Sequence, residues 1–224
     1  MNRIKVVIFD AYGTLFDVNS AAKKISVDIG EDWEGFANYW RTTQLEYTWL
    51  RSLMRKHKDF WDITKESLEK AMKFYAIQPT KKKKLLDLYR VLDVFSEVKF
   101  TLRYFKKNNY KVSILSNGTP KLIKQLVINN QLNHYIDDIF SIEEVGIYKP
   151  DPRVYEIPIK KYKILKNEVM FFSSNTWDIC GAGHFGYHCV WVNREQNIFD
   201  FLGYTPEIII KDLTEVLKRP EFFL

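Results

Sequence analysis

Cysteine is scarce in this sequence, which contains only Cys180 and Cys189. Two cysteines form neither a disulfide framework nor the repeated ligand spacing of a zinc site, so we expect two buried free thiols. The four histidines show no metal-ligand spacing either. These shortages exclude small disulfide-stapled domains and zinc-binding modules.

Long apolar runs are also missing, since none approaches the roughly 18 residues that a membrane-spanning helix needs. No secretory signal is visible, because Met1, Asn2 and Arg3 lead directly into a strand-like run. We therefore expect a cytoplasmic protein without a membrane partner. Of the 224 residues, 46% are hydrophobic and 28% are charged, which is typical of a globular chain with a sizeable core.

The net charge of +6 raises the question of a nucleic-acid partner, and the densest basic run is Lys81, Lys82, Lys83 and Lys84. This run begins an amphipathic helical pattern after Pro79, so a solvated helix face explains it better. We expect no nucleic-acid partner. The positive charge would instead attract small anions toward a site.

Continuous apolar runs without polar alternation recur along the chain, and each predicts a strand buried on both faces of a parallel sheet. We expect strands at residues 5–9, 110–115, 140–142, 169–172, 189–192 and 207–210. Helical patterns separate them, and Ser96 is expected to cap the one that runs to Lys107. One begins at Thr119 and Pro120, a favourable pair for an N-cap and a first helical position, and the last spans 212–219. Pro158 should kink or shorten the helix that contains it.

No strand pattern occurs between the first and second strands, where aromatic residues recur at helical spacing. We expect helices at 20–29, 31–56 and 59–76 and another after Thr80. This block predicts an all-helical cap subdomain at 16–94, inserted into a core domain formed by 1–15 and 95–224. The fold class is then α/β, with a doubly wound, Rossmann-like parallel sheet.

Polar residues end three of the predicted core strands, centred on Asp10, Ser116 and Asp178, and a loop adds Lys149. The carboxyl ends of parallel strands meet at one crevice, so these four side chains should converge. Asp10 is the first candidate for a nucleophile, because Gly13 turns the chain after it and Thr14 can hydrogen-bond locally. Taken alone, Asp10 could equally start a turn, and Lys149 could be a surface lysine.

The stretch IFDAYGTLFD resembles the first motif of the haloacid dehalogenase superfamily, in which the first aspartate attacks the substrate covalently. Its core DAYGTL is the form found in L-2-haloacid dehalogenases. The stretches YWRTTQLEYTWLRSLM, ILSNGTP, YKPDPRVY and FFSSNTWD also match motifs of that branch, in order and at similar spacing. The resemblance therefore covers nearly the whole chain.

By this resemblance each motif residue has an expected role. Asp10 is the nucleophile, Thr14 and Ser173 hydrogen-bond its carboxylate, Lys149 offsets the local charge, Tyr155 and Asn175 order the site, and Asp178 positions or activates water. Ser116 and backbone amides near Ala11 and Tyr12 bind the substrate carboxylate, Arg41, Asn117 and Trp177 hold the halide, and Leu45, Phe60 and Trp61 form an apolar wall.

Two departures from the phosphatases of the superfamily indicate a metal-free site without a cofactor. Phosphatases have a second aspartate two residues after the nucleophile, which protonates the leaving alkoxide, whereas this chain has Tyr12. They also have Gly-Asp where this chain has Ser173 and Ser174, and a serine hydroxyl is a poor Mg²⁺ ligand. A departing halide needs neither a proton nor a metal ion.

The sequence thus predicts an L-2-haloacid dehalogenase that hydrolyses short L-2-haloalkanoic acids through an ester on Asp10. The alternative within the same fold is a Mg²⁺-dependent phosphatase acting on a small metabolite. A third hypothesis is a non-catalytic binding protein that uses the basic surface of this scaffold. The resemblance also implies a homodimer, for which aromatic-rich helices could supply an interface.

Overall fold

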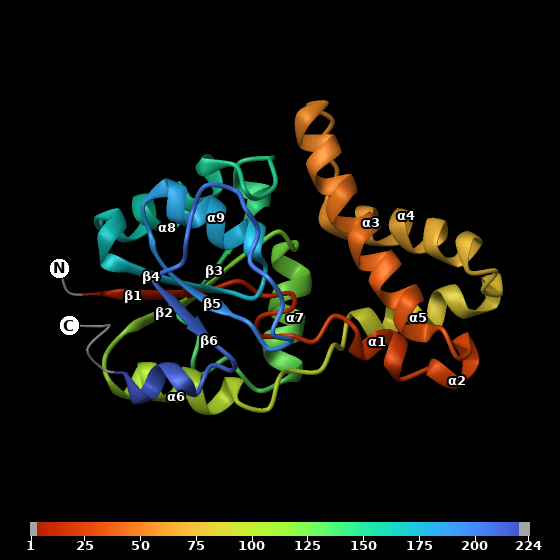
Figure 1. The fold of residues 1–224 in the computed structure, drawn as a ribbon, viewed down its shortest axis with the longest axis horizontal. Coiled ribbons are helices and arrows are strands. Elements are labelled where there is room, and N and C mark those ends of the chain that lie inside the picture. The colour runs from red at the N-terminus through yellow and green to blue at the C-terminus, as the bar shows by residue number, and fades with distance from the viewer. Residues whose placement is uncertain (1–3, 220–224) are drawn as a thin grey trace.

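The computed structural model describes residues 4–219, and its centre is a six-stranded parallel sheet (Figure 1). The strands are β1 (Val6–Phe9), β2 (Lys111–Ser116), β3 (Asp138–Ser141), β4 (Val169–Ser173), β5 (His188–Val192) and β6 (Ile208–Ile210). Their order in the sheet is β3-β2-β1-β4-β5-β6. The strand order therefore reverses beside β1, and in such sheets the crevice at that reversal binds the ligand. The predicted doubly wound α/β fold is confirmed.

Strand β1 is the centre of the core because all four of its residues are buried. It pairs in parallel with β2 on one side and β4 on the other. Phe9 lies opposite Phe172 in this register, and the two rings stack with their centroids 4.6 Å apart. This packing fixes the end of β1, the point at which Asp10 begins.

Helices cover both faces of the sheet. They are α6 (Val98–Lys107), α7 (Pro120–Asn129), α8 (Pro152–Tyr162) and α9 (Thr176–Phe185). In Figure 1, α8 and α9 lie above the sheet and α6 lies below it. The predicted start of α7 is confirmed, since Thr119 Oγ1 accepts a hydrogen bond from Leu122 N and Pro120 is the first helical residue. Pro158 lies buried inside α8, which continues past it to Tyr162.

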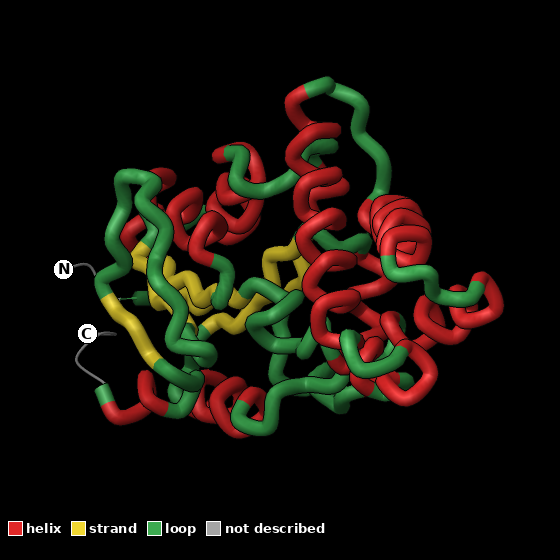
Figure 2. The backbone as a smooth tube through the Cα atoms, turned by 45° about the vertical axis from the view of Figure 1, so that its right-hand side comes forward, coloured by secondary structure: helices red, strands yellow, loops and turns green. Residues whose placement is uncertain are grey.

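A separate group of helices follows β1. It contains α1 (Ser20–Lys23), α2 (Ser26–Ile29), α3 (Trp33–Leu53), α4 (Phe60–Phe74) and α5 (Lys82–Tyr89), and we call it the helical unit. The helical unit faces the carboxyl ends of the strands (Figure 1), and in Figure 2 its helices gather beside the sheet. A site at those strand ends therefore has the sheet on one side and the helical unit on the other.

The chain passes from the sheet into the helical unit near Phe16 and returns near Val94. These two passages, which we call the first and second chain crossings, lie side by side. Phe16 pairs with Val94 in an antiparallel bridge. On either side of it, Asp17 N donates to Asp93 O at 2.8 Å, and Phe95 N donates to Leu15 O at 3.1 Å. These crossings lie next to the boundaries predicted for a cap at 16–94, and that division stays a prediction.

Two helix predictions in the first half of the chain are partly wrong. The helix expected at 20–29 is split into α1 and α2, because the backbone of Ile25 leaves the helical region at φ −127°. Helix α1 has three buried residues, Ser20, Ala21 and Ala22, whereas α2 has no buried residue. The amphipathic pattern therefore does not continue through the break. Ser96 does not cap α6, whose N-cap is Glu97 without a side-chain hydrogen bond.

The last predicted helix, 212–219, is also wrong, because only a short 3₁₀ helix forms at Glu215–Lys218. Asp212 Oδ1 accepts hydrogen bonds from both the backbone N and the hydroxyl of Thr214. Such local side-chain bonds give the backbone an alternative to α-helical pairing. Part of the predicted last domain, residues 220–224, lies outside the described residues.

The predictions on cysteine are confirmed, since Cys180 and Cys189 are both buried and free. Among the helices of residues 4–219, none combines the length and the apolar character that a membrane crossing requires.

Candidate active site

Asp10 follows the last residue of β1 at the point where the strand order reverses. Its backbone N donates to Phe172 O at 2.8 Å, which continues the pairing of β1 with β4 by one residue. Its side chain is buried, with the residue only 5% exposed. A carboxylate at this depth needs compensating donors, and the surrounding residues supply them.

The turn after β1 brings one donor back to Asp10. Gly13 adopts a φ of +87°, a conformation that residues with a side chain rarely take. The chain then folds back, with Leu15 N and Phe16 N both donating to Ala11 O. Thr14 Oγ1 consequently donates to Asp10 Oδ2 at 3.1 Å, as predicted.

Lys149 lies between two carboxylates. Its Nζ is 3.2 Å from Asp10 Oδ1 and 2.8 Å from Asp178 Oδ2, and its side chain is wholly buried. Its backbone N donates to Asn117 Oδ1 at 3.1 Å, which ties the Lys149 loop to the end of β2. The alternative of a surface lysine is therefore excluded. One cation serves both acids at the crevice.

Asp178, in the first turn of α9, accepts three side-chain hydrogen bonds. Tyr155 OH donates to its Oδ1 at 2.8 Å, and Lys149 Nζ and Ser173 Oγ donate to its Oδ2 at 2.8 and 3.2 Å. Burial raises the pKa of Asp178 to about 6, with Lys149 lowering it and the charge of Asp10 raising it further. This acid therefore titrates near neutral pH.

Ser173 differs from the prediction. It was expected to hydrogen-bond Asp10, but its hydroxyl donates to Asp178, and no bond to Asp10 occurs among the hydrogen bonds of residues 4–219. The reason is that Ser173 ends β4 five residues before Asp178, on the segment that enters α9. Asn175 takes the position at the nucleophile instead, donating from Nδ2 to Asp10 Oδ2 at 2.8 Å and to Tyr12 O at 3.2 Å.

Arg41 comes from α3 of the helical unit and is held by Gln44 one turn later. Its Nη1 donates to Gln44 Oε1 at 2.9 Å. Gln44 is fixed in turn, because its Nε2 donates to Thr64 Oγ1 at 2.7 Å and to Tyr89 OH at 3.0 Å. The guanidinium thus has a defined orientation before any ligand binds.

Aromatic side chains join the turn after β1 to the helical unit. The Tyr12 ring centroid lies 5.1 Å from that of Phe60 and 5.7 Å from that of Tyr89. Trp61 packs near Tyr89 at 6.3 Å, and Leu45 is partly buried on α3. Tyr12 OH is buried and has no hydrogen-bond partner among residues 4–219. Tyr12, Phe60, Tyr89 and Trp61 thus pack together beside the turn after β1, and the apolar wall expected of Leu45, Phe60 and Trp61 stays a prediction.

Ser116 is the last residue of β2 and Asn117 follows it, in agreement with the prediction of polar residues at this strand end. Ser116 is wholly buried, and its Oγ accepts from Gly118 N at 3.0 Å. Gly118 must lack a side chain, because a Cβ there would lie 2.8 Å from both the Tyr12 ring and Ile123. The ends of β1 and β2 therefore touch through Tyr12 and Gly118.

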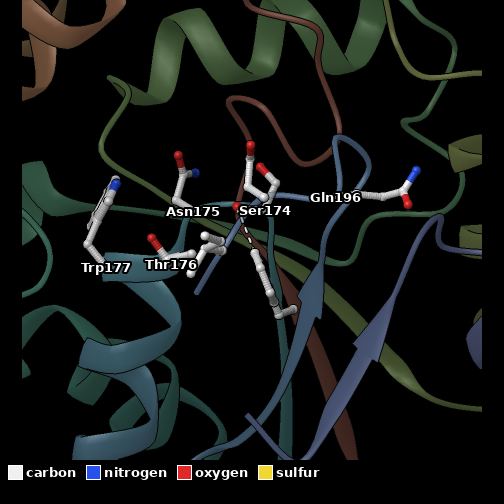
Figure 3. Close-up of a pocket in the computed structure, with 8 residues that line it drawn as sticks. Ser174, Asn175, Thr176, Trp177 and Gln196 are labelled. Atoms are coloured by element: carbon white, nitrogen blue, oxygen red, sulfur yellow. Dashed lines mark hydrogen bonds between the residues drawn. The ribbon is translucent and has the colours of Figure 1, made fainter. Parts of the chain in front are cut away.

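Trp177 lies at the start of α9, where its ring meets Trp49 of α3 edge to face at 5.5 Å. Figure 3 shows Trp177 with Asn175 and Ser174 along a pocket of about 600 Å³. The dashed line marks the bond from Trp191 Nε1 to Ser174 O, 3.1 Å long.

A second cavity, of about 520 Å³, lies between the helical unit and the strand ends. Its lining includes Arg41 from α3, Asn175 beside the nucleophile, the cations Lys23 and Arg194, and the acids Asp17 and Glu195. The cavity thus brings Arg41 of the helical unit and Asn175, which donates a hydrogen bond to Asp10, to one opening.

Comparison with known proteins now places this arrangement in a family. The family model for haloacid dehalogenase-like hydrolases matches residues 4–186. The chain belongs to this family.

Several relatives within the haloacid dehalogenase-like hydrolases carry the name (S)-2-haloacid dehalogenase. The chain is 38% identical over 199 residues to (S)-2-haloacid dehalogenase 4A of Burkholderia cepacia, covering 88% of this chain and 86% of that protein. It is 37% identical to the (S)-2-haloacid dehalogenase of Pseudomonas sp. strain YL, covering 97% and 95%.

Solved structures of the family agree with the fold. A crystal structure of a dehalogenase superposes with a TM-score of 0.95 at 35% identity, covering 97% of both chains. The L-2-haloacid dehalogenase of Xanthobacter autotrophicus with chloropropionic acid covalently bound superposes with a TM-score of 0.91 at 28% identity, covering 99% of this chain and 100% of that one.

Gln44, which orients Arg41 in this haloacid dehalogenase-like hydrolase, was not among the predicted site residues. A signal was present, because Gln44 lies three residues after Arg41 within the matched stretch, on the same face of a helix. Its partners Thr64 and Tyr89 come from α4 and α5. Only the packing of these three helices reveals the network.

Metal-ligating side chains are not clustered in the described part of this family member. Among residues 4–219, no group of three or more histidine, cysteine, aspartate or glutamate side chains is arranged to hold a metal ion. Ser174, at the position where phosphatases have an acid, instead lies beside Thr14, with 3.3 Å between the two hydroxyl oxygens.

Proposed function

We propose that this protein is an (S)-2-haloacid dehalogenase, which converts short L-2-haloalkanoic acids to D-2-hydroxy acids and halide. The identities to proteins of that name, over nearly the whole chain, support the proposal. The observation that carries it is the placement of Tyr12, two residues after Asp10, in the aromatic wall. Burial raises the pKa of Tyr12 well above its usual range, so Tyr12 is a poor acid for a leaving alkoxide. A halide leaves without a proton.

In the first step an Asp10 carboxylate oxygen attacks the carbon that bears the halogen. The carbon–halogen bond breaks, the halide leaves with the bonding electrons, and the carbon is inverted. An ester on Asp10 results. Thr14, Asn175 and Lys149 hold the carboxylate in one orientation, and such fixed geometry is what lowers the barrier to displacement.

Binding groups surround the reacting carbon in this proposal. Ser116 and backbone amides of the turn near Ala11 and Tyr12 hold the substrate carboxylate, and Leu45 and Phe60 enclose its alkyl group. Arg41, with Asn117 and Trp177, receives the halide. The fixed orientation of Arg41 through Gln44 supports this role, because a preorganised cation costs little reorganisation when charge develops on the halogen.

In the second step water attacks the carbonyl carbon of the ester. Asp178 removes a proton from that water, the bond between the carbonyl carbon and the alkyl oxygen breaks, and the departing alkoxide takes the proton back from Asp178, which releases the 2-hydroxy acid. Asp10 is regenerated. A carboxyl group whose pKa is about 6 is a suitable base near neutral pH.

Halide release from L- and D-2-chloropropionate, measured with and without EDTA, tests the proposed function. We expect release from the L enantiomer alone, unaffected by EDTA. Phosphatase activity that EDTA abolishes, without halide release, would establish the alternative of a Mg²⁺-dependent phosphatase. Activity equal to wild type after Asp10→Asn would contradict any role of Asp10 as nucleophile.

A single turnover in ¹⁸O-labelled water tests the ester. The product of the first turnover should carry an unlabelled oxygen from Asp10, and the label should enter the Asp10 carboxylate. A labelled first product would mean that water attacks the substrate directly. Two further expectations, a cytoplasmic location and a homodimer, stay predictions, and size-exclusion chromatography with light scattering tests the second.

A further inference from the structure

Arg194, at the end of β5, reaches the turn that follows Asp10. Its Nη1 donates to Gly13 O at 3.2 Å and its Nη2 donates to Thr14 O at 2.9 Å. The side chain is only 17% exposed. Two successive backbone carbonyls of the nucleophile's turn are therefore held by one guanidinium.

The same guanidinium contacts the second chain crossing. Arg194 Nη2 and Nε lie 2.6 and 3.1 Å from Glu97 Oε1, and the guanidinium carbon lies 3.9 Å from the centroid of the Phe95 ring. Phe95 N donates to Leu15 O, so the two crossings are bonded to each other here. Arg194 joins both crossings to the end of β5.

A continuous path runs from Arg194 to the carboxylate of Asp10. Arg194 holds the carbonyl of Thr14, and the hydroxyl of Thr14 accepts from Ser174 N at 2.9 Å and donates to Asp10 Oδ2 at 3.1 Å. Thr14 is thus held at its backbone and at its side chain. A shift of its backbone would lengthen the bond to Asp10.

A lysine at position 194 could not reproduce these contacts. The guanidinium is a planar fork with five donors, and here it serves two carbonyls, one carboxylate and one ring face. An ammonium group on a flexible stem can satisfy the carboxylate of Glu97 or a carbonyl, but it has no planar geometry to hold all of them.

We propose that Arg194, held by Glu97, is a positioning residue that fixes Thr14 and through it the attacking carboxylate of Asp10. This inference rests on the proposed role of Asp10 as nucleophile. It predicts that the loss of Arg194 slows attack on the substrate while leaving substrate binding intact. The hydrogen bonds described for Arg194 go to Glu97, Gly13 and Thr14 and to neither Asp10 nor Asp178. The proposed function gives Arg194 no contact with the substrate.

The first experiment compares wild type with Arg194→Lys, which keeps the charge. We expect kcat for L-2-chloropropionate to fall about 10- to 100-fold, with KM changed less than about twofold, because small misplacements of a reacting group cost rates of this size. Arg51→Lys is the matched control, since Arg51 also bonds a carboxylate, that of Glu66 at 2.8 Å, and a backbone carbonyl, that of Lys56. The control should keep the wild-type kcat. A change confined to KM in Arg194→Lys would overturn the proposal, because it would mean that Arg194 binds the substrate anion.

A double-mutant cycle separates positioning from general damage to the fold. Thr14→Val removes the bond to Asp10, so the further substitution Arg194→Lys should lower kcat less than about twofold in that background. If the two losses multiply independently, Arg194 does not act through Thr14 and the proposal is refuted.

If Arg194→Lys fails to fold, Glu97→Gln tests the same positioning role. It retains the shape of Glu97 and removes the charge that orients the guanidinium, so we expect a kcat reduced about three- to tenfold at unchanged KM. An unchanged kcat in this variant would refute the proposal. Halide release by the wild type tests the proposed function alone, whereas the ratio of variant to wild-type kcat tests the positioning role alone.

Discussion

Lys149→Met removes the cation that lies between Asp10 and Asp178, while it keeps the length and apolar stem of the side chain. Both contacts are within hydrogen-bond distance, at 3.2 and 2.8 Å, and both carboxyl groups are buried. Coulomb's law with an effective dielectric constant of about 20 gives an attraction of about 5 to 6 kcal/mol for each contact. Part of this attraction is offset by the cost of burying the charges.

The expected loss in the free energy of unfolding is about 3 to 5 kcal/mol at pH 8, the range found when one partner of a buried ion pair is removed. The sign of its pH dependence follows from Asp178. The pKa of Asp178 is already raised to about 6, and Lys149 is the main group that lowers it, so the variant should raise it further. A group with a raised pKa favours the folded state at low pH, so a proton replaces part of the missing cation there. The loss should therefore be smaller at pH 5 than at pH 8.

Urea unfolding of both proteins at pH 5 and pH 8, followed by circular dichroism, measures this difference. Lys106→Met is the matched control, since Lys106 pairs with Asp137 at 2.7 Å but is 32% exposed. We expect the control to cost less than about 1 kcal/mol at either pH. If Lys149→Met lowers the free energy of unfolding equally at the two pH values, the reasoning is refuted. A buried carboxyl group without its cation should bind a proton at pH 5 more than at pH 8.

Three further predictions concern the site. The rate of ester hydrolysis, measured by single turnover, should rise with pH as Asp178 ionises, through an apparent pKa below the value of about 6 in the free protein, because the ester removes the Asp10 charge that raises it; a rate that does not fall when the pH is lowered from 6 to 4 would contradict this. Tyr155→Phe removes a bond that lowers the pKa of Asp178, so the midpoint of that profile should move to higher pH, and an unmoved midpoint would exclude the bond as its cause. Gly118→Ala places a Cβ 2.8 Å from the Tyr12 ring and should lower kcat/KM about tenfold or more for L-2-chloropropionate, and an unchanged kcat/KM would exclude this steric conflict.

The sheet and much of the crevice could be predicted from the sequence, because both depend on local signals. The unbroken apolar run of β1 predicts a buried parallel strand, and topology places the polar residues after β1 and β4 at one edge. Asp10 and Asp178 accordingly converge on Lys149, whose Nζ lies 3.2 Å from Asp10 Oδ1 and 2.8 Å from Asp178 Oδ2. That these residues meet follows from the fold class.

The hydrogen-bond partner of each side chain in the crevice could not be predicted in the same way. Ser173 and Asn175 are two residues apart, and only the path of the backbone from β4 into α9 decides that Ser173 bonds Asp178 and Asn175 bonds Asp10. The contacts of Gln44 and Arg194 each join three separate segments of the chain. No local pattern encodes such contacts.

At residues 212–219 the prediction was wrong for a different reason. The apolar spacing there favours a helix, but local hydrogen bonds from Thr214 to the Asp212 side chain favour a turn. Residues 212–219 have a helical apolar pattern, with Leu213 and Val216 both buried. The bonds from Thr214 to the Asp212 side chain nevertheless hold the backbone in a tight turn. Periodicity alone gives too little weight to such turns.

The antiparallel bridge between Phe16 and Val94 makes the entry and the exit of the helical unit close neighbours, like the two strands at the base of a hairpin. A segment whose ends already meet adds little closure entropy to the chain that receives it, whatever its length. The helical unit can therefore change in length while the register of β1 with β2 and β4 stays as it is. Because α3 of this unit also carries Arg41, a change there would alter selectivity and the proposed release of halide together.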